Sequence, residues 1–106
     1  MIMPELTKDA DKMICIIYKM YLEKIKTGMS KVASNAFEED FYKSDKLLSK
    51  WHDDDVTMTF LELGQKEYLK IYITGNFEIT NQAIIYMENR FKNGLLDVVD
   101  LVSKFI

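Results

Sequence analysis

The chain of 106 residues is poor in residues that interrupt regular structure and in residues that carry chemistry. One proline, Pro4, and four glycines leave room for long regular elements. The single cysteine, Cys15, excludes an internal disulfide and fits a reducing compartment, and its apolar neighbours predict a buried, unreactive thiol. His52 is the only histidine, and no glycine-rich phosphate loop, HExxH, CxxC or GxSxG motif occurs. We therefore expect no enzymatic activity, no catalytic residue and no cofactor.

Long apolar runs are also missing. No stretch of about 18 apolar residues is present, so no membrane span is expected. The first six residues lack the charge and apolar run of a signal peptide. With 48% hydrophobic and 29% charged residues, the composition is that of a globular protein with one core. The expectation is a cytoplasmic protein with no membrane contact, forming a single domain over residues 1–106.

Positive charge is scarce in the second half of the chain. The net charge is −3. Residues 1–52 hold nine lysines and eight acidic residues, whereas residues 53–106 hold five basic and nine acidic residues. Domains dedicated to nucleic acid are usually basic. Any basic surface must therefore come mainly from the first half.

Helical periodicity is the strongest signal that is present. It predicts helices over residues 8–27, 30–37, 44–51 and 53–64, and a helical region from residue 81 to the end. Thr7 or Asp9 can begin the first helix, and Gly28 can end it. In the short second helix, apolar residues such as Val32 and Phe37 are expected to point inward. The Asn93-Gly94 pair is expected to divide the last region into two helices.

The hydrophobic period changes to two over residues 68–73, which predicts a strand. Thr74, Gly75 and Asn76 are turn residues, and residues 77–80 predict a second strand. Two registers compete in this hairpin. A two-residue loop sets Ile73 opposite Glu78; a three-residue loop sets Ile73 opposite Phe77 and is preferred because it keeps apolar side chains on one face. That register also sets Ile71 opposite Ile79, with Leu69 on the same face and Tyr68, Lys70 and Tyr72 on the other.

The predicted fold is mainly α with one β-hairpin, an α+β domain that closes with a helical segment over about residues 81–106. Helices, a hairpin and a closing helix in this order resemble a winged helix-turn-helix domain. The hairpin would be the wing, and the helix at residues 54–63 would take the recognition position. The segments YKMYLEKIKTGMSK and AIIYMENRFKNGLLDVVDLVSKFI also resemble parts of small uncharacterised proteins of Gram-positive bacteria and their mobile elements.

The resemblance implies one of two functions. One is a small bacterial or phage DNA-binding transcriptional regulator, and the other is a non-enzymatic protein–protein interaction module on the same fold that does not bind DNA. Lysines around the recognition position favour phosphate contacts. Two features oppose the direct reading of DNA bases: the helix carries acidic residues, and the single arginine of the chain lies outside it. The residues predicted to contact double-stranded DNA are Lys43, Lys46, Lys50, Thr57, Lys66, Lys70 and Tyr72.

Two further features concern partners and ions. The last helical region is apolar on more than one face, which predicts a homodimer whose interface includes Leu96, Val99, Leu101 and Ile106. Asp53, Asp54 and Asp55 are explained by the charge preference of a first helical turn, so no metal site is predicted.

Overall fold

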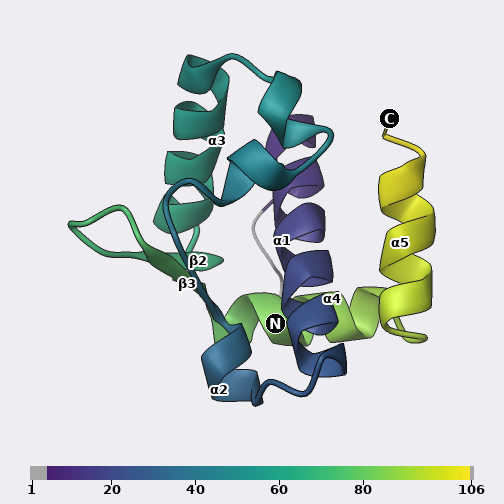
Figure 1. Cartoon of the computed structure of the whole chain (residues 1–106). Coiled ribbons are helices and arrows are strands. Elements are labelled where there is room, and N and C mark those ends of the chain that lie inside the picture. Colours follow the sequence, from purple (N-terminus) through teal and green to yellow (C-terminus); the bar gives the residue numbers. More distant parts are fainter. Residues whose placement is uncertain (1–4, 106) are drawn as a thin grey trace.

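A computed structural model describes residues 5–105 and shows an α+β fold, mostly helical with a small three-stranded antiparallel sheet (Figure 1). This confirms the expected fold class. None of the helices within residues 5–105 combines the length and the apolar character needed to cross a bilayer. The elements follow one another as α1 (Lys8–Lys26), α2 (Lys31–Ser34), β1 (Ala36–Phe37), the 3₁₀ helices η1 (Phe41–Ser44) and η2 (Leu48–Lys50), α3 (Asp53–Gln65), β2 (Leu69–Ile71), β3 (Phe77–Ile79), α4 (Asn81–Arg90) and α5 (Leu95–Ser103).

Helix α1 is the centre of the core. Thr7 caps it by accepting a hydrogen bond from the Ala10 N–H at 3.2 Å, and Gly28 follows its end with φ +105°. The helix packs against α2, α3, α4 and α5, so residues 13–18 are all buried although they run around the whole helix. Arg90 of α4 donates two hydrogen bonds to the Asp11 carboxylate, at 2.5 and 3.1 Å. The first expected helix is confirmed.

The helix predicted over residues 30–37 is wrong in its second half. Ser30 caps α2 through the Ala33 N–H, but α2 ends at Ser34, and Val32, expected to point inward, is exposed. Phe37 belongs instead to β1, where its ring stacks on Phe77 with centroids 5.2 Å apart. Pairing with β3 therefore determines the local structure here, which helical periodicity could not indicate.

The helix predicted over residues 44–51 is also wrong. The segment forms η1 and η2, separated by an extended residue, Asp45. The Asp45 carboxylate accepts hydrogen bonds from the backbone N–H groups of Leu47 and Leu48, at 3.0 and 2.9 Å. This local side-chain bonding competes with the α-helical pattern. Leu48 is buried as expected.

The hairpin is present, but neither expected register occurs. Ile71 lies opposite Phe77 and Leu69 opposite Ile79, a shift of two residues from the preferred register. The strands are shorter because the Tyr72 N–H donates to the Asn76 carbonyl and closes a turn at residues 73–75. A shift of two keeps the same face inward, whereas Ile73 moves into the turn and is fully exposed.

Three further details of the hairpin region differ from expectation. Tyr68 precedes β2 and is buried, not outward, with its ring 5.9 Å from that of Tyr86. Strand β1 pairs with β3, which gives the sheet order β1-β3-β2. Gly64 does not end α3: it gives room to β2, since a Cβ there would lie 2.6 Å from Ile71 Cδ1.

The division of the last helical region is confirmed. Thr80 caps α4 by accepting from the Ala83 N–H at 3.2 Å. Gly94, with φ +66°, lies in the break before α5, as the sequence predicted. In Figure 1, α5 lies on one side of α1, while α3 and the projecting hairpin lie on the other.

Candidate interaction surfaces

Helix α3 presents an exposed stripe opposite its buried face. Val56, Thr59 and Leu63 are buried. The stripe lies about half a turn away, at the helical steps i, i+4, i+7 and i+11. Met58 and Leu61 in it are 71% and 52% exposed. We define the α3 stripe as Asp54, Met58, Leu61 and Gln65.

The N-terminal turn of α3 is acidic and the helix contains no lysine or arginine. Asp53, Asp54 and Asp55 are all exposed. No ion pair to any of the three occurs within residues 5–105. The exposed surface of α3 is therefore apolar in its middle and negative at its start.

One flank of α3 is tied to the start of α1. Glu62 accepts hydrogen bonds from the Thr7 N–H at 3.0 Å and the Thr7 hydroxyl at 2.7 Å. Lys66 donates to the Glu5 carbonyl and lies 3.9 Å from the Glu62 carboxylate. Lys66, predicted to contact DNA, is thus engaged inside the molecule. This anchoring fixes the direction in which the α3 stripe faces.

The other predicted DNA contacts lie on η1, between η1 and η2, on η2, on α3 and on the hairpin. Lys43, Lys46 and Lys50 are exposed, and no ion pair to them occurs within the described part of the chain. Lys43 and Thr57 line a common groove of about 260 Å³, which Glu39 and Asp40 also line. The structure thus brings two of the predicted contacts together, but beside two carboxylates.

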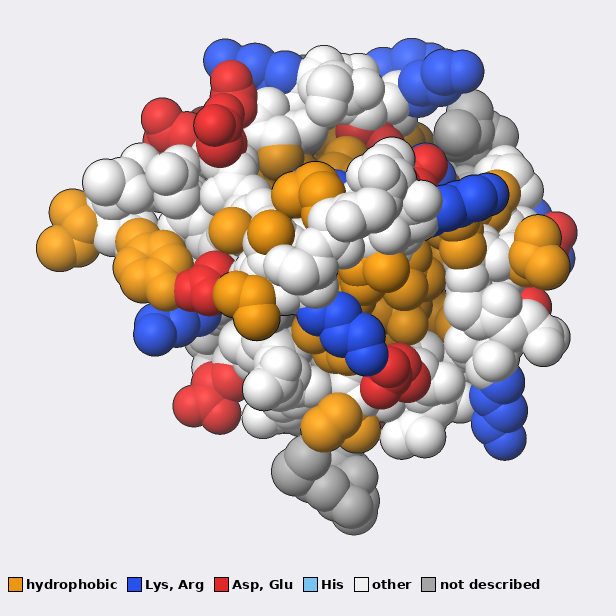
Figure 2. Space-filling model, turned by 60° about the horizontal axis from the view of Figure 1, so that its bottom comes forward, with side chains coloured by type: hydrophobic (Ala, Val, Ile, Leu, Met, Phe, Trp, Pro, Cys, Tyr) orange, Lys and Arg blue, Asp and Glu red, His pale blue; other side chains and the backbone are white. Residues whose placement is uncertain are grey.

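On the hairpin, Lys70 and Tyr72 are both exposed, as expected. The Lys70 ammonium lies 5.5 Å from the centroid of the Tyr72 ring. The Tyr72 hydroxyl donates to the Glu78 carboxylate, and this hydrogen bond raises the pKa of Tyr72. Figure 2 shows hydrophobic side chains on the projecting hairpin, and Ile73 in the hairpin turn is fully exposed.

A four-phenylalanine cluster connects the sheet with η1 and α3. Phe77 lies at its centre, with ring centroids 4.9 Å from Phe41, 4.9 Å from Phe60 and 5.2 Å from Phe37. Phe41 and Phe60 also line the groove beside α3. The cluster therefore couples the position of α3 to that of η1 and β1.

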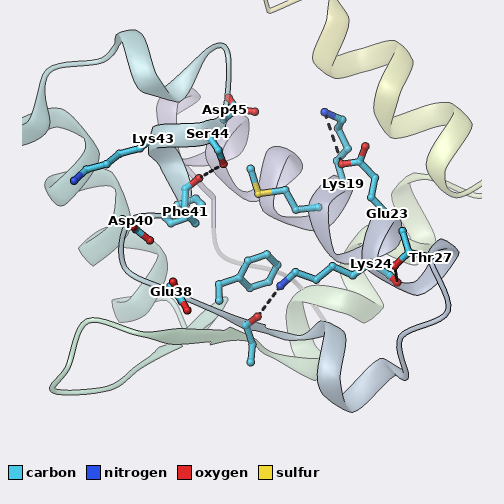
Figure 3. Close-up of a pocket in the computed structure, with 13 residues that line it drawn as sticks. Lys19, Glu23, Lys24, Thr27, Glu38, Asp40, Phe41, Lys43, Ser44 and Asp45 are labelled. Atoms are coloured by element: carbon cyan, nitrogen blue, oxygen red, sulfur yellow. Dashed lines mark hydrogen bonds and ion pairs between the residues drawn. The ribbon is translucent and has the colours of Figure 1, made fainter.

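The α1–β1–η1 cleft, which two members of this cluster line, measures about 940 Å³ (Figure 3). Met20, Phe37 and Phe41 are its hydrophobic lining residues. Lys24 extends along it, donates to the Ala36 carbonyl at 2.7 Å and lies 3.6 Å from the centroid of the Phe37 ring. Figure 2 shows a hollow with hydrophobic side chains at its floor and charged side chains at its rim.

Helix α5 carries the predicted dimer contacts. Its inner face packs on α1 through Val98 and Val102. Leu96 and Val99 are 80% and 41% exposed, whereas Leu101 is half-buried. Ile106 lies outside the described residues. The exposed apolar surface of α5 is therefore limited to two of the predicted side chains.

The remaining chemically active groups are not arranged as a reactive site. Cys15 is fully buried, and burial raises the pKa of its thiol to about 12. His52 is exposed at the start of α3 and its side chain forms no capping hydrogen bond. Within residues 5–105, no three His, Cys, Asp or Glu side chains are placed to hold a metal ion.

Two features escaped the sequence analysis. Leu61 follows Met58 by three residues and lies outside the arc of Val56 and Leu63, so helical periodicity alone could have identified it as exposed. The cleft around Lys24 had no such signal, because Phe37 reaches it only through a strand that periodicity did not predict.

Comparisons of the chain with protein-family models, with curated proteins and with solved structures find no match.

Proposed function

We propose that this protein is an interaction module of winged-helix layout, in which the α3 stripe binds a segment of a partner protein. The partner segment carries apolar and basic side chains. The observation that carries the proposal is the exposure of Met58 and Leu61 next to three aspartates that form no ion pair within residues 5–105. The order of elements, with α3 followed by the β2–β3 hairpin, supports the winged-helix layout.

Apolar burial supplies the attraction in this proposal. A side chain such as leucine or methionine contributes about 1.5–3 kcal/mol when it becomes fully buried. Met58 and Leu61 are adjacent on the helix surface, since residues three apart are neighbours. A partner that covers both buries two large side chains at one place, which is the pattern of an interface centre.

The aspartates determine the preferred charge of the partner. Asp53, Asp54 and Asp55 repel duplex phosphates, which carry one negative charge per about 1.7 Å of helix axis. A basic segment is attracted by the same charges, and this complementarity selects it over an acidic one. The α3 stripe therefore fits a lysine- or arginine-containing amphipathic segment better than the major groove of DNA.

The first prediction tests this docking with a defined probe. A synthetic amphipathic peptide of leucine and lysine is expected to bind and to shift the methyl resonances of Met58 and Leu61. The double variant M58S/L61S should bind it about tenfold more weakly or worse, because the interface centre is lost. The matched variant L96S/V99S removes exposed apolar side chains from α5 and should bind like the wild type. Affinities come from isothermal titration and the contact site from NMR.

A matched peptide of leucine and glutamate provides the charge control. It should bind more weakly than the lysine peptide, and the difference should shrink in the triple variant that replaces Asp53, Asp54 and Asp55 with asparagine. Equal binding of M58S/L61S and wild type, or a preference for the acidic peptide, contradicts the proposal.

A second candidate function is a small bacterial or phage DNA-binding transcriptional regulator. The exposure of Lys43, Lys46, Lys50 and Lys70 favours it, since lysines without intramolecular ion pairs are available for phosphates. Both functions place the protein in the cytoplasm, where the single Cys15 remains reduced.

The second prediction separates these functions. If the regulator proposal holds, duplex DNA binds at low salt with an affinity that falls steeply as salt rises, because phosphate contacts release counterions. Replacing Lys46, Lys50 and Lys70 with glutamate should abolish this binding. The control replaces three other exposed lysines, Lys26, Lys31 and Lys92, and should bind appreciably better than the first triple variant. Fluorescence anisotropy without any DNA binding at low salt contradicts the regulator function.

A further inference from the structure

We propose that the α1–β1–η1 cleft binds a small organic acid, through its carboxylate at Lys24 and its apolar body against Met20 and Phe41. This inference does not rest on the proposed docking at α3. The volume of the cleft, about 940 Å³, is within the range of small-molecule sites, which extends to about 1,000 Å³.

The cation in the cleft is only partly satisfied. An ammonium group has three N–H donors, and the structure gives Lys24 one hydrogen-bond acceptor, the Ala36 carbonyl. Its side chain covers the Phe37 ring and is partly desolvated, which lowers the pKa of Lys24. A carboxylate that reaches the two other donors gains charge-assisted hydrogen bonds in a site of reduced dielectric.

The acidic residues that line the cleft do not compete equally with a ligand carboxylate for the Lys24 ammonium. The Asp45 carboxylate already accepts from the N–H groups of Leu47 and Leu48, and Glu23 lies 3.9 Å from the Lys19 ammonium. Glu38 and Asp40 are exposed, and the charge of Glu38 only partly offsets the effect of burial, which lowers the pKa of Lys24. Lys24 is thus the charge that runs along the hydrophobic lining, as Figure 3 shows, and Lys19 adds a second cation at the rim.

The hydrophobic lining explains why the ligand needs an apolar body. Met20 and Phe41 are both partly buried and both line the cleft. A simple inorganic anion leaves this surface in water, whereas an alkyl or aryl chain removes it from water. The combination of one partly satisfied cation and an apolar lining therefore selects an amphiphilic acid.

The experiment uses octanoate, octylammonium and octan-1-ol as probes, which share one alkyl chain and differ in charge. The protein carries ¹³C-labelled methionine methyl groups. Octanoate should shift the Met20 methyl resonance in a saturable manner and leave Met29 and Met58 unchanged, since neither lines the cleft. Stronger binding of octylammonium, equal binding of octanol, or shifts that miss Met20 overturn the proposal.

Two variants test the role of Lys24. Lys24→Met should weaken octanoate binding about tenfold and leave octanol binding unchanged, because only octanoate makes a charge-assisted contact with the Lys24 ammonium. Lys31→Met is the control, since Lys31 is exposed outside the cleft, and it should bind octanoate like the wild type. Unchanged octanoate affinity in a folded Lys24→Met overturns the proposal. The buried Met13 and Met87 methyl groups report on folding, and if the variant unfolds, the comparison of the three probes on the wild type decides.

Discussion

Cys15 illustrates how burial controls the chemistry of a single residue. Its thiol is fully buried in α1, and desolvation raises its pKa from 9.0 to about 12. The neighbouring Tyr18 hydroxyl behaves in the same way, with a pKa raised from 10.0 to about 12. Both groups must stay protonated for the core to remain packed, so alkaline solution acts against the folded state.

The third prediction follows from this pKa shift. The folded protein holds the thiol proton more tightly than the unfolded chain, so the contribution to stability is complete below pH 9 and is lost as the pH rises towards 12. Each pH unit in this window costs about 1.4 kcal/mol per proton. The variant Cys15→Ala should therefore lose less stability than the wild type between pH 9 and 11 in urea denaturation. Parallel pH profiles would contradict this prediction, because they would mean that folding does not shift the pKa of the Cys15 thiol.

At the level of elements, long periodic segments could be predicted and short ones could not. Helix α1 and the break at Gly94 follow from apolar spacing and from local capping residues, which act within a few positions of the chain. The misassigned segments have two causes: local bonding to the Asp45 carboxylate decides residues 44–51, whereas a distant partner decides the end of the segment 30–37. Phe37 leaves the helical pattern to stack on Phe77, forty residues later in the chain.

The same distinction applies to the candidate surfaces. Exposure of Met58 follows from the helical period of α3, because Met58 lies about half a turn around the helix from the buried Val56 and Leu63. The cleft needs α1, β1 and η1 together, and β1 was not predicted, so its lining could not be assembled from the sequence. Hairpin register was missed because turn closure at Asn76, rather than apolar matching, fixes the pairing.

The end of α3 leads to the fourth prediction. The chain turns at Glu67, which has φ +65°, a conformation that favours glycine. Glu67→Gly should raise the free energy of unfolding by about 1 kcal/mol, because the strain of a non-glycine residue is removed. The matched variant Gln65→Gly lies at the last residue of α3, relieves no such strain, and should lower the free energy of unfolding by about 1 kcal/mol at most. Both free energies of unfolding are measured by urea denaturation. A lower stability of Glu67→Gly would show that contacts of the Glu67 side chain stabilise the fold by more than the backbone strain costs.

At the scale of the whole molecule, the two exposed apolar helix surfaces lie on opposite sides. In Figure 1, α3 and the hairpin lie on one side of α1, and α5 lies on the other. A twofold dimer through α5 would therefore leave both copies of the α3 stripe accessible. The dimer expected from the sequence and the docking proposed for α3 are compatible, and each can be tested without disturbing the other.

The fifth prediction concerns this dimer. Stable interfaces bury about 800 Å² per partner, and Leu96 and Val99 alone supply a small part of that area, so association should appear only at high protein concentration. The variant L96E/V99E places charges in the interface and should be a monomer at all concentrations in light scattering. Its helical circular dichroism should be kept, because Val98 and Val102 still pack on α1. It should also bind the lysine–leucine peptide with wild-type affinity, since α3 is unchanged. A wild type that stays monomeric at high concentration contradicts the dimer, whereas an unfolded variant would assign the two side chains to the core of the monomer.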